Sequence, residues 1–226
     1  MKKIQPDFVL FDMIGTTIQD TNNGKSLILD SFHQAFKNSG YDIPYEILNQ
    51  QRGKTKRVAI QTILSNDSLS QDLVDEIYHH FIDLLNISAS SFVAIDGATE
   101  IFNLLKKANI KIGIGSGLPL AFMHQLLAQL HWEKSTFDYI GSSDELVAGR
   151  PDPIMILDAK KQLNLDTKSI ILKIGDTVVD VQEGKNADVL TAMVRTGTQS
   201  TDALGSLTPD YILDSVKDLK QIIRLL

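Results

Sequence analysis

Short apolar runs recur along the chain and alternate with segments of helical periodicity. The first run covers residues 8–11, ends at Asp12 and leads into a glycine turn. From residue 96 onward, runs of strand length lie at 110–114, 139–140, 170–174, 189–194 and 211–213. Such runs, separated by helices, are typical of a parallel sheet with helices on both faces. The pattern therefore predicts an α/β fold built on a doubly wound parallel sheet.

The stretch 24–91 differs from the rest because it is helical in pattern and contains no predicted strand. Apolar residues at helical spacing predict helices over 27–36, ending near Gly40, and over 56–64 and 69–85. We expect an all-helical insert at 20–93 within a core domain formed by 1–19 and 94–226. An insert beside the strand ends can act as a cap that excludes water from a site; a decorative insertion is the alternative.

The composition is that of an ordinary globular protein, with 226 residues, 43% hydrophobic and 22% charged. A net charge of −6 without a long basic run argues against nucleic-acid binding. The absence of cysteine excludes disulfides, thiolate metal sites and a cysteine nucleophile. Because no window approaches a membrane span and the first apolar run is too short for a signal segment, we expect a cytoplasmic location away from membranes.

Asp12 is the first candidate for chemistry. A carboxylate at the end of a buried strand is costly unless it is paired, hydrogen-bonded or bound to a metal. Ligands of open α/β sheets bind at that edge. Asp12 is therefore a candidate nucleophile or metal ligand, and a structural cap is the alternative.

Further polar residues follow later strands. Ser116 lies between glycines, where a hydroxyl and backbone N–H groups ahead of a helix form an anion cradle. Arg150 lies in a proline-rich loop and suits a phosphate, although a surface turn is the better explanation of this loop taken alone. Asp176 and Asp180 are four residues apart at the start of a predicted helix, and such a pair suits Mg²⁺; N-capping by Asp176 is the alternative.

Four cations, Arg52, Lys54, Lys56 and Arg57, lie together in the insert. For most of them a solvated basic face is the expected environment. The residues at the strand ends, taken together, meet the needs of phosphoryl transfer, which are an in-line attacker, charge neutralisation and a metal. Aspartate is a known nucleophile in aspartyl-phosphate chemistry.

These motifs resemble those of the haloacid dehalogenase (HAD) superfamily over nearly the whole chain. Residues 12–17 are similar to its first motif, Ser116 to its second, Arg150 to its third and residues 175–180 to its fourth. The insert resembles the type 1 cap. The resemblance implies a Rossmann-like core and a Mg²⁺-dependent hydrolase of a small phosphorylated or phosphonylated metabolite, with an aspartyl-phosphate intermediate and a monomeric or homodimeric state.

The resemblance also implies a role for each matching residue. The implied nucleophile is Asp12, and the implied catalytic phosphate binders are Ser116 and Arg150. Further phosphate contacts would come from Thr16 and Gly117. The implied Mg²⁺ ligands are Asp12, Asp176 and the backbone carbonyl of Ile14, and Asp180 would orient the site.

Ile14 is a departure that points to one branch of the superfamily. Most of its phosphatases have a second aspartate there, which protonates the leaving group and then activates water, and isoleucine can do neither. The phosphonatase branch, with phosphonoacetaldehyde hydrolase as its named activity, also lacks that acid. Residues 149–153 and 173–177 resemble the same branch.

Lys56 matches the branch by its spacing of three residues after Gly53. In that branch a cap lysine forms an imine with an aldehyde, so that the C–P bond can break. The methionine before the glycine and the histidine three residues after the lysine are replaced by Arg52 and Ala59. Three hypotheses follow: hydrolysis of a small phosphate or phosphonate, phosphonoacetaldehyde hydrolysis through a Lys56 imine, and a non-catalytic phosphate-ligand binding protein. In the second, Lys56 is catalytic; otherwise it is a fixed cation.

Overall fold

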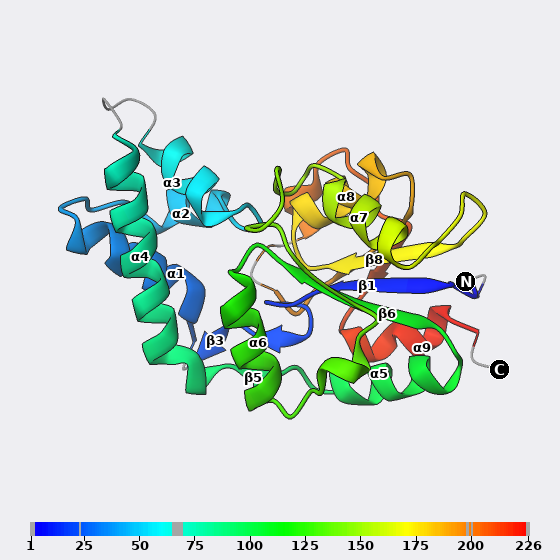
Figure 1. Cartoon of the computed structure of the whole chain (residues 1–226). Helices are drawn as coiled ribbons and strands as arrows, with labels where there is room; N and C mark the ends of the chain where they lie inside the picture. Colours follow the sequence, from blue (N-terminus) through cyan, green and yellow to red (C-terminus); the bar gives the residue numbers. More distant parts are fainter. Residues whose placement is uncertain (1–2, 23, 65–69, 198, 200, 225–226) are drawn as a thin grey trace.

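A parallel sheet lies at the centre of the protein in the computed structural model, which describes residues 3–22, 24–64, 70–197, 199 and 201–224 (Figure 1). Its strands are β1 (Phe8–Asp12), β6 (Lys111–Ser116), β7 (Tyr139–Ser142), β8 (Ile171–Gly175), β9 (Leu190–Val194) and β10 (Tyr211–Leu213). They lie in the order β10-β9-β8-β1-β6-β7, and each neighbouring pair is parallel. The predicted α/β fold and each predicted strand of this sheet are confirmed.

Helices cover both faces of the sheet because its central strand is apolar on both sides. The helices of this part are α5 (Ala98–Lys107), α6 (Leu120–Gln129), α7 (Ile154–Gln162), α8 (Val178–Asn186) and α9 (Leu219–Ile222), with short 3-10 turns at Lys134–Thr136, Thr201–Leu204 and Val216–Asp218. Phe8 and Leu10 of β1 belong to the cluster that includes α7, whereas Val9 and Phe11 belong to the cluster that includes α5 and α9. The alternation of these residues follows from the two-residue period of a strand.

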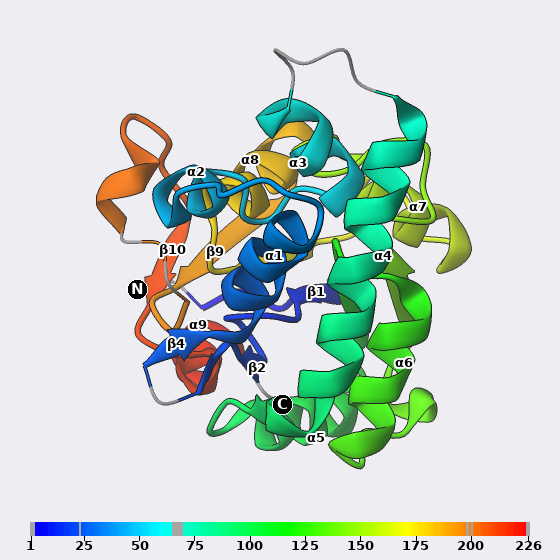
Figure 2. The same ribbon diagram turned by 90° about the vertical axis from the view of Figure 1, so that its left-hand side faces the viewer.

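The helical insert leaves and rejoins the sheet domain through two short antiparallel strands. They are β2 (Ile18–Gln19) and β5 (Val93–Ala94), and Ile18 pairs with Ala94. Between them lie β3 (Thr21–Asn22), β4 (Lys25–Ser26), α1 (Leu27–Asn38), α2 (Tyr45–Gln50), α3 (Lys56–Ile63), α4 (Gln71–Ser88) and a 3-10 turn at Ala89–Ser91. In Figure 2, α1 to α4 lie in front of the sheet.

The three predicted helices of the insert correspond to α1, α3 and α4, and residue 69 lies outside the described residues. Two features differ from the sequence-based prediction. The stretch expected to hold no strand contains β4, which pairs with β3 in a two-residue ladder too short to produce an apolar alternation. The pattern also does not reveal α2, whose six residues bury only Leu48.

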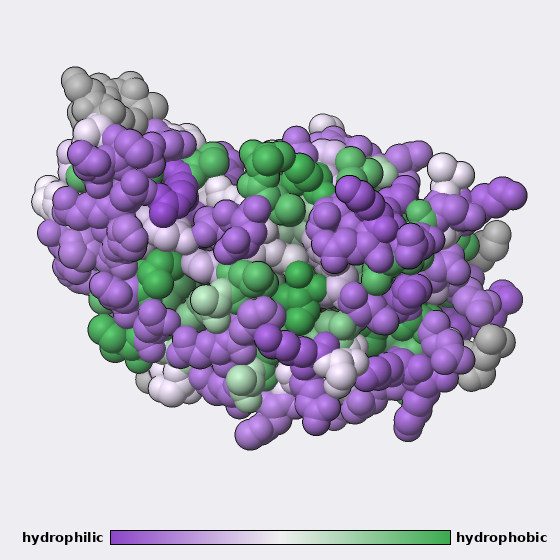
Figure 3. All heavy atoms as spheres, viewed as in Figure 1, coloured by the Kyte–Doolittle hydropathy of each residue, from purple (hydrophilic) through white to green (hydrophobic). Residues whose placement is uncertain are grey.

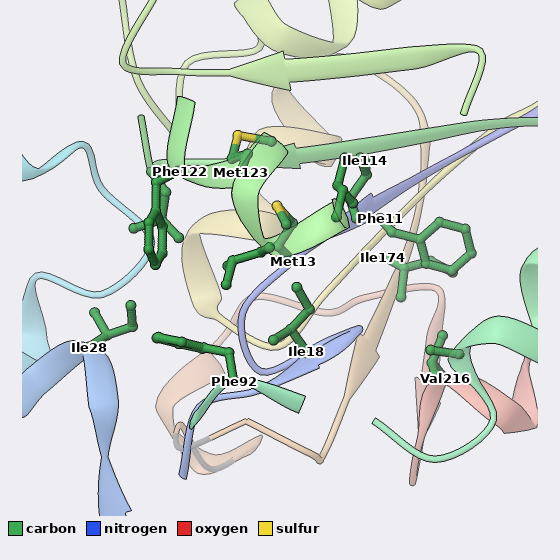
Figure 4. Packing of buried hydrophobic residues seen from close by; sticks show 14 of the residues in the cluster. Phe11, Met13, Ile18, Ile28, Phe92, Ile114, Phe122, Met123, Ile174 and Val216 are labelled. Atoms are coloured by element: carbon green, nitrogen blue, oxygen red, sulfur yellow. The ribbon is translucent and has the colours of Figure 1, made fainter. Parts of the chain in front are cut away.

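One apolar core continues from the sheet into the insert. Figure 4 shows Ile18 beside Phe92 and below Met13, with Ile28 and Phe122 together on one side of this group. All five side chains are buried. Hydrophilic residues cover most of the face seen in Figure 3, with hydrophobic residues in smaller groups between them. Within the described part of the chain, no helix is long and apolar enough to cross a membrane.

Candidate active site

The carboxyl ends of three neighbouring strands meet beneath the helical insert, and a pocket lies there. Asp12 ends β1, Ser116 ends β6, and Asp176 directly follows β8. The pocket has about 430 Å³ of space, part of it open to solvent, and its lining includes the predicted site residues Asp12, Ile14, Lys56, Ser116, Gly117 and Arg150. Residues far apart in sequence converge because parallel strands end at the same edge of a sheet.

Arg150 joins the nucleophile candidate to the second acidic motif. Its Nη1 donates to Oδ1 of Asp12 at 2.5 Å and also to Asp180. Burial raises the pKa of Asp12 to about 6, against the lowering effect of Arg150. The arginine is almost completely buried, so the surface-turn alternative for this residue is wrong. An always-charged planar fork beside a carboxylate is suited to holding an anion at that carboxylate.

Asp176 has the environment of a cation ligand. Asp12, Asp176 and Asp180 each offer an oxygen within 4.8 Å of the others. One oxygen of Asp176, Oδ2, is buried without a hydrogen-bond partner, and burial together with the charges of Asp12 and Asp180 raises the pKa of Asp176 well above its usual value. A hard divalent cation such as Mg²⁺ would satisfy that oxygen and offset the repulsion. The acidic cluster therefore fits Mg²⁺.

Asp180 differs from Asp176 because its oxygens already have partners in the protein. It accepts from Arg150 and from the backbone N–H and hydroxyl of Thr177, and it lies 3.1 Å from the Lys173 amine. Burial raises its pKa, but Arg150 and Lys173 outweigh burial and hold it at about 2. Thr177, and not Asp176, is the N-cap of α8, so the capping alternative for Asp176 is wrong.

The predicted phosphate contacts fall into two groups. Ser116 and Gly117 line the pocket, and the Ser116 hydroxyl accepts from the Leu118 backbone N–H at 3.3 Å. Thr16 is fully buried and its hydroxyl donates to Oδ1 of Asp176 at 3.1 Å. This hydrogen bond leaves Oδ2 of Asp176 as the oxygen without a partner. A phosphate contact of Thr16 stays a prediction.

Lys56 begins α3 and its amine is held in an apolar part of the pocket. The Nζ atom lies 5.3 Å from the ring centre of Phe32 and 5.7 Å from that of Phe81. Among the described residues, no side chain forms a hydrogen bond or ion pair with it. Burial, followed by the charges of Arg52 and Arg150, lowers the pKa of Lys56 to about 8. A buried lysine without an anionic partner is typical of a reactive amine.

The predicted solvated basic face of the insert is wrong for Arg52 and Lys56. Arg52 and Lys56 are each only 7% exposed, and Lys54 and Arg57 are half-buried. Arg52 pairs with Asp20 at 2.6 Å. Periodicity within one helix cannot reveal this environment, because the partner lies 32 residues earlier.

Two further contributions to the site were not assigned from the residues alone. Lys173, inside β8, lies between Asp180 and Glu183 and is 1% exposed. A lysine within an otherwise apolar strand was the signal for this cluster. Thr196 and Gly197, which follow β9, also border the site: the Thr196 hydroxyl donates to the Gly15 carbonyl, and a Cβ at Gly197 would overlap Asp176. Residues 198 and 200 lie outside the described residues.

Comparison with known proteins agrees with this geometry. A family model described as haloacid dehalogenase-like hydrolase matches residues 9–194. The chain belongs to this family. It is therefore a hydrolase with a Rossmann-like core, and the resemblance seen in the motifs is confirmed.

Curated relatives and solved structures match nearly the whole chain. Phosphonoacetaldehyde hydrolase of Bacillus cytotoxicus is 26% identical over 229 residues, covering 96% of this chain and 86% of the relative. The enzyme of the same name from Parabacteroides distasonis is 29% identical, covering 88% and 78%. The structure of a phosphonoacetaldehyde hydrolase-like protein from Oleispira antarctica has a TM-score of 0.84 at 21% identity, covering 98% and 92%. A hydrolase from Pseudomonas syringae has a TM-score of 0.85 at 18% identity, covering 97% and 100%.

Proposed function

We propose that this hydrolase removes the phosphoryl group of a small phosphonate or phosphate through an aspartyl-phosphate at Asp12. The pocket supports this proposal because a carboxylate at the end of β1, a hydroxyl at the end of β6 and a cation in the loop between β7 and α7 converge on it. An oxygen of Asp12 attacks phosphorus, while Arg150 and Ser116 hold the phosphoryl oxygens. Asp12, Asp176 and the Ile14 carbonyl would hold Mg²⁺. When bound, the metal neutralises phosphoryl charge.

Ile14 restricts the substrates that such a site can use. Its side chain lines the pocket and supplies no proton for a leaving alkoxide. The group that leaves phosphorus must therefore be a weak base, or it must transfer its electrons to an acceptor. An acyl phosphate meets the first condition, and a phosphonate with a carbonyl group next to the C–P carbon meets the second.

The buried, unpaired amine of Lys56 favours the phosphonate. With a pKa of about 8, about one Lys56 in ten is neutral at pH 7, compared with roughly three in ten thousand for an ordinary lysine. The neutral amine condenses with the substrate carbonyl to an imine and releases water. When Asp12 attacks phosphorus, the C–P electrons move into the imine and form an enamine. Protonation at carbon and hydrolysis of the imine and of the aspartyl-phosphate complete the reaction.

The helical insert is proposed to act as a cap domain at 20–93 over a core at 1–19 and 94–226. Its segment Gly53–Thr55 lies against the loops of the core. A Cβ at Gly53 would overlap Val179, and one at Gly117 would lie 3.1 Å from the Lys54 carbonyl. Gly53 has a φ of +78°, which favours glycine at this contact. Such close contact supports a closed arrangement that excludes water.

A second candidate is a phosphatase for substrates with good leaving groups. Ala59 is buried and occupies the position where the phosphonatase branch has a histidine. No proton-relaying side chain is therefore available there to an imine. In this case Lys56 acts as a fixed cation.

The test measures phosphate and acetaldehyde release from phosphonoacetaldehyde with Mg²⁺, beside acetyl phosphate, for the wild type, Asp12→Asn and Lys56→Arg. Release of both products, lost in both variants, supports the imine. If phosphate is released from acetyl phosphate but nothing is released from phosphonoacetaldehyde, C–P cleavage of the aldehyde is refuted. Loss of that release in Asp12→Asn and its retention in Lys56→Arg would favour the phosphatase. Ligand binding without turnover on either compound would favour the non-catalytic hypothesis.

A further inference from the structure

Arg52 is a pocket-lining cation that the proposed reaction does not use. It lies in the turn between α2 and α3 and is 7% exposed. Its Nε donates to Oδ1 of Asn49 at 2.8 Å, and its Nη2 donates to Oδ2 of Asp20 at 2.6 Å and to the Ser26 hydroxyl at 2.7 Å. Three of its five N–H groups are thus used in holding the side chain in place.

The remaining donor, Nη1, has no hydrogen-bond partner among the described residues. Because the rest of the guanidinium is held in place and Arg52 lines the pocket, Nη1 can donate to an acceptor that arrives with the ligand. Asp20 is not that acceptor for Nη1. It already accepts from the Ser26 hydroxyl and the Ile28 backbone N–H, and it is not part of the pocket lining.

The position of Arg52 relative to the reacting groups restricts which part of the ligand it meets. Arg52, Lys56 and Asp12 line the same pocket. After burial, the charge of Arg52 is the strongest influence that lowers the pKa of Lys56. Arg150 is the cation beside Asp12. When the phosphoryl group lies at Asp12 and Arg150, the part of the substrate that carries the carbonyl therefore lies toward Lys56 and Arg52.

We propose that Arg52 binds a carboxylate on the carbonyl carbon of the substrate, so that the preferred substrate class is a 3-phosphono-2-oxo acid and not a simple aldehyde. This inference rests on the proposed function. The free N–H groups of Nη1 can donate to a carboxylate oxygen, and the positive charge strengthens that hydrogen bond. An aldehyde has only hydrogen at that position, so it offers Nη1 no acceptor.

The reaction balances with the groups already assigned. The Lys56 amine condenses with the ketone and releases water, Asp12 takes the phosphoryl group, and the C–P electron pair forms an enamine that is protonated at carbon. Two water molecules then hydrolyse the imine and the aspartyl-phosphate. The net reaction consumes one water and releases phosphate and a 2-oxo acid.

Binding to the wild-type protein tests the carboxylate site without turnover. The two probes, 3-phosphonopropanoate and propylphosphonate, differ only in a carboxylate against a methyl group. With Mg²⁺ present, calorimetry is expected to give at least about 10-fold tighter binding of the carboxylate. The advantage should vanish in Arg52→Met, persist in part in Arg52→Lys, and remain in Lys54→Met, which removes a neighbouring cation. Equal binding of both probes by the wild type overturns the inference and needs no variant.

Turnover separates this inference from the proposed function. The wild type is expected to have a higher kcat/KM for 3-phosphonopyruvate than for phosphonoacetaldehyde, and Arg52→Met should reverse the order. Cleavage of the aldehyde but not of the 2-oxo acid overturns the Arg52 assignment and leaves the imine mechanism intact. A carboxylate preference in binding, with no C–P cleavage of either compound, supports the Arg52 site and refutes the C–P reaction.

Discussion

Replacing Lys56 by methionine should make the folded protein more stable, because burial of the amine opposes its protonation. The shift of its pKa from 10.5 to about 8 corresponds to about 3 kcal/mol of lost stability at pH 7. Methionine has similar length, carries no charge and packs well beside aromatic rings such as those of Phe32 and Phe81. Lys56→Met should therefore raise the free energy of unfolding by about 3 kcal/mol.

The difference between the two proteins should depend on pH in one direction. Between about pH 8 and 10.5 the unfolded chain keeps the Lys56 proton while the folded chain has lost it, so wild-type stability rises with pH. The advantage of Lys56→Met should be full below about pH 8, fall to roughly 1.5 kcal/mol near pH 9.5, and vanish above pH 10.5.

Urea unfolding followed by circular dichroism, at several pH values from about 7 to 10, measures both effects. The matched control is Lys107→Met on α5, whose side chain is exposed; its effect should stay within about 0.5 kcal/mol at every pH. A Lys56→Met protein that is less stable than the wild type, or whose advantage does not change with pH, would refute the reasoning. The amine would then be solvated or paired, and the case for a reactive Lys56 would fail.

Three further predictions concern the rest of the site. Asp176→Asn should lower Mg²⁺-dependent phosphate release at least about 100-fold while raising the melting temperature without metal, because it removes a buried charge; unchanged metal activation would contradict this. Gly15→Ala should lower the unfolding free energy by about 1–3 kcal/mol, since Gly15 has a φ of +86° and a Cβ would overlap Asp176; an unchanged urea midpoint would oppose it. Tyr78→Phe removes the hydrogen bond that joins α4 of the insert to Asp144, in the loop after β7 of the core. Because this contact holds the insert against the core, its loss should raise KM several-fold with little loss of kcat, and an unchanged KM would count against closure of the insert.

The arrangement of the sheet and the motifs at its edge could be predicted from the sequence. Short apolar runs identify strands because neighbouring residues of a buried parallel strand all face packed helices. A polar residue directly after such a run must lie at the carboxyl edge, so the meeting of Asp12, Ser116 and Asp176 follows from local pattern and strand direction. The strand-end part of the pocket is of this kind.

The spacing of Lys56 after Gly53 marked it as a candidate, but the surroundings of Arg52 and Lys56 were decided by tertiary structure. Arg52 is fixed by Asp20 and Ser26 on the segment that precedes α1, and Lys56 lies between Phe32 of α1 and Phe81 of α4. No local pattern encodes these contacts, because they depend on how helices distant in sequence pack against each other. That packing buries two residues of the basic run, so that Arg52 is held by Asp20 and Ser26 and the pKa of the Lys56 amine is lowered. The strand pattern thus determined where the polar strand-end residues of the candidate site lie, and the packing of the insert decided which cations line the pocket beside them.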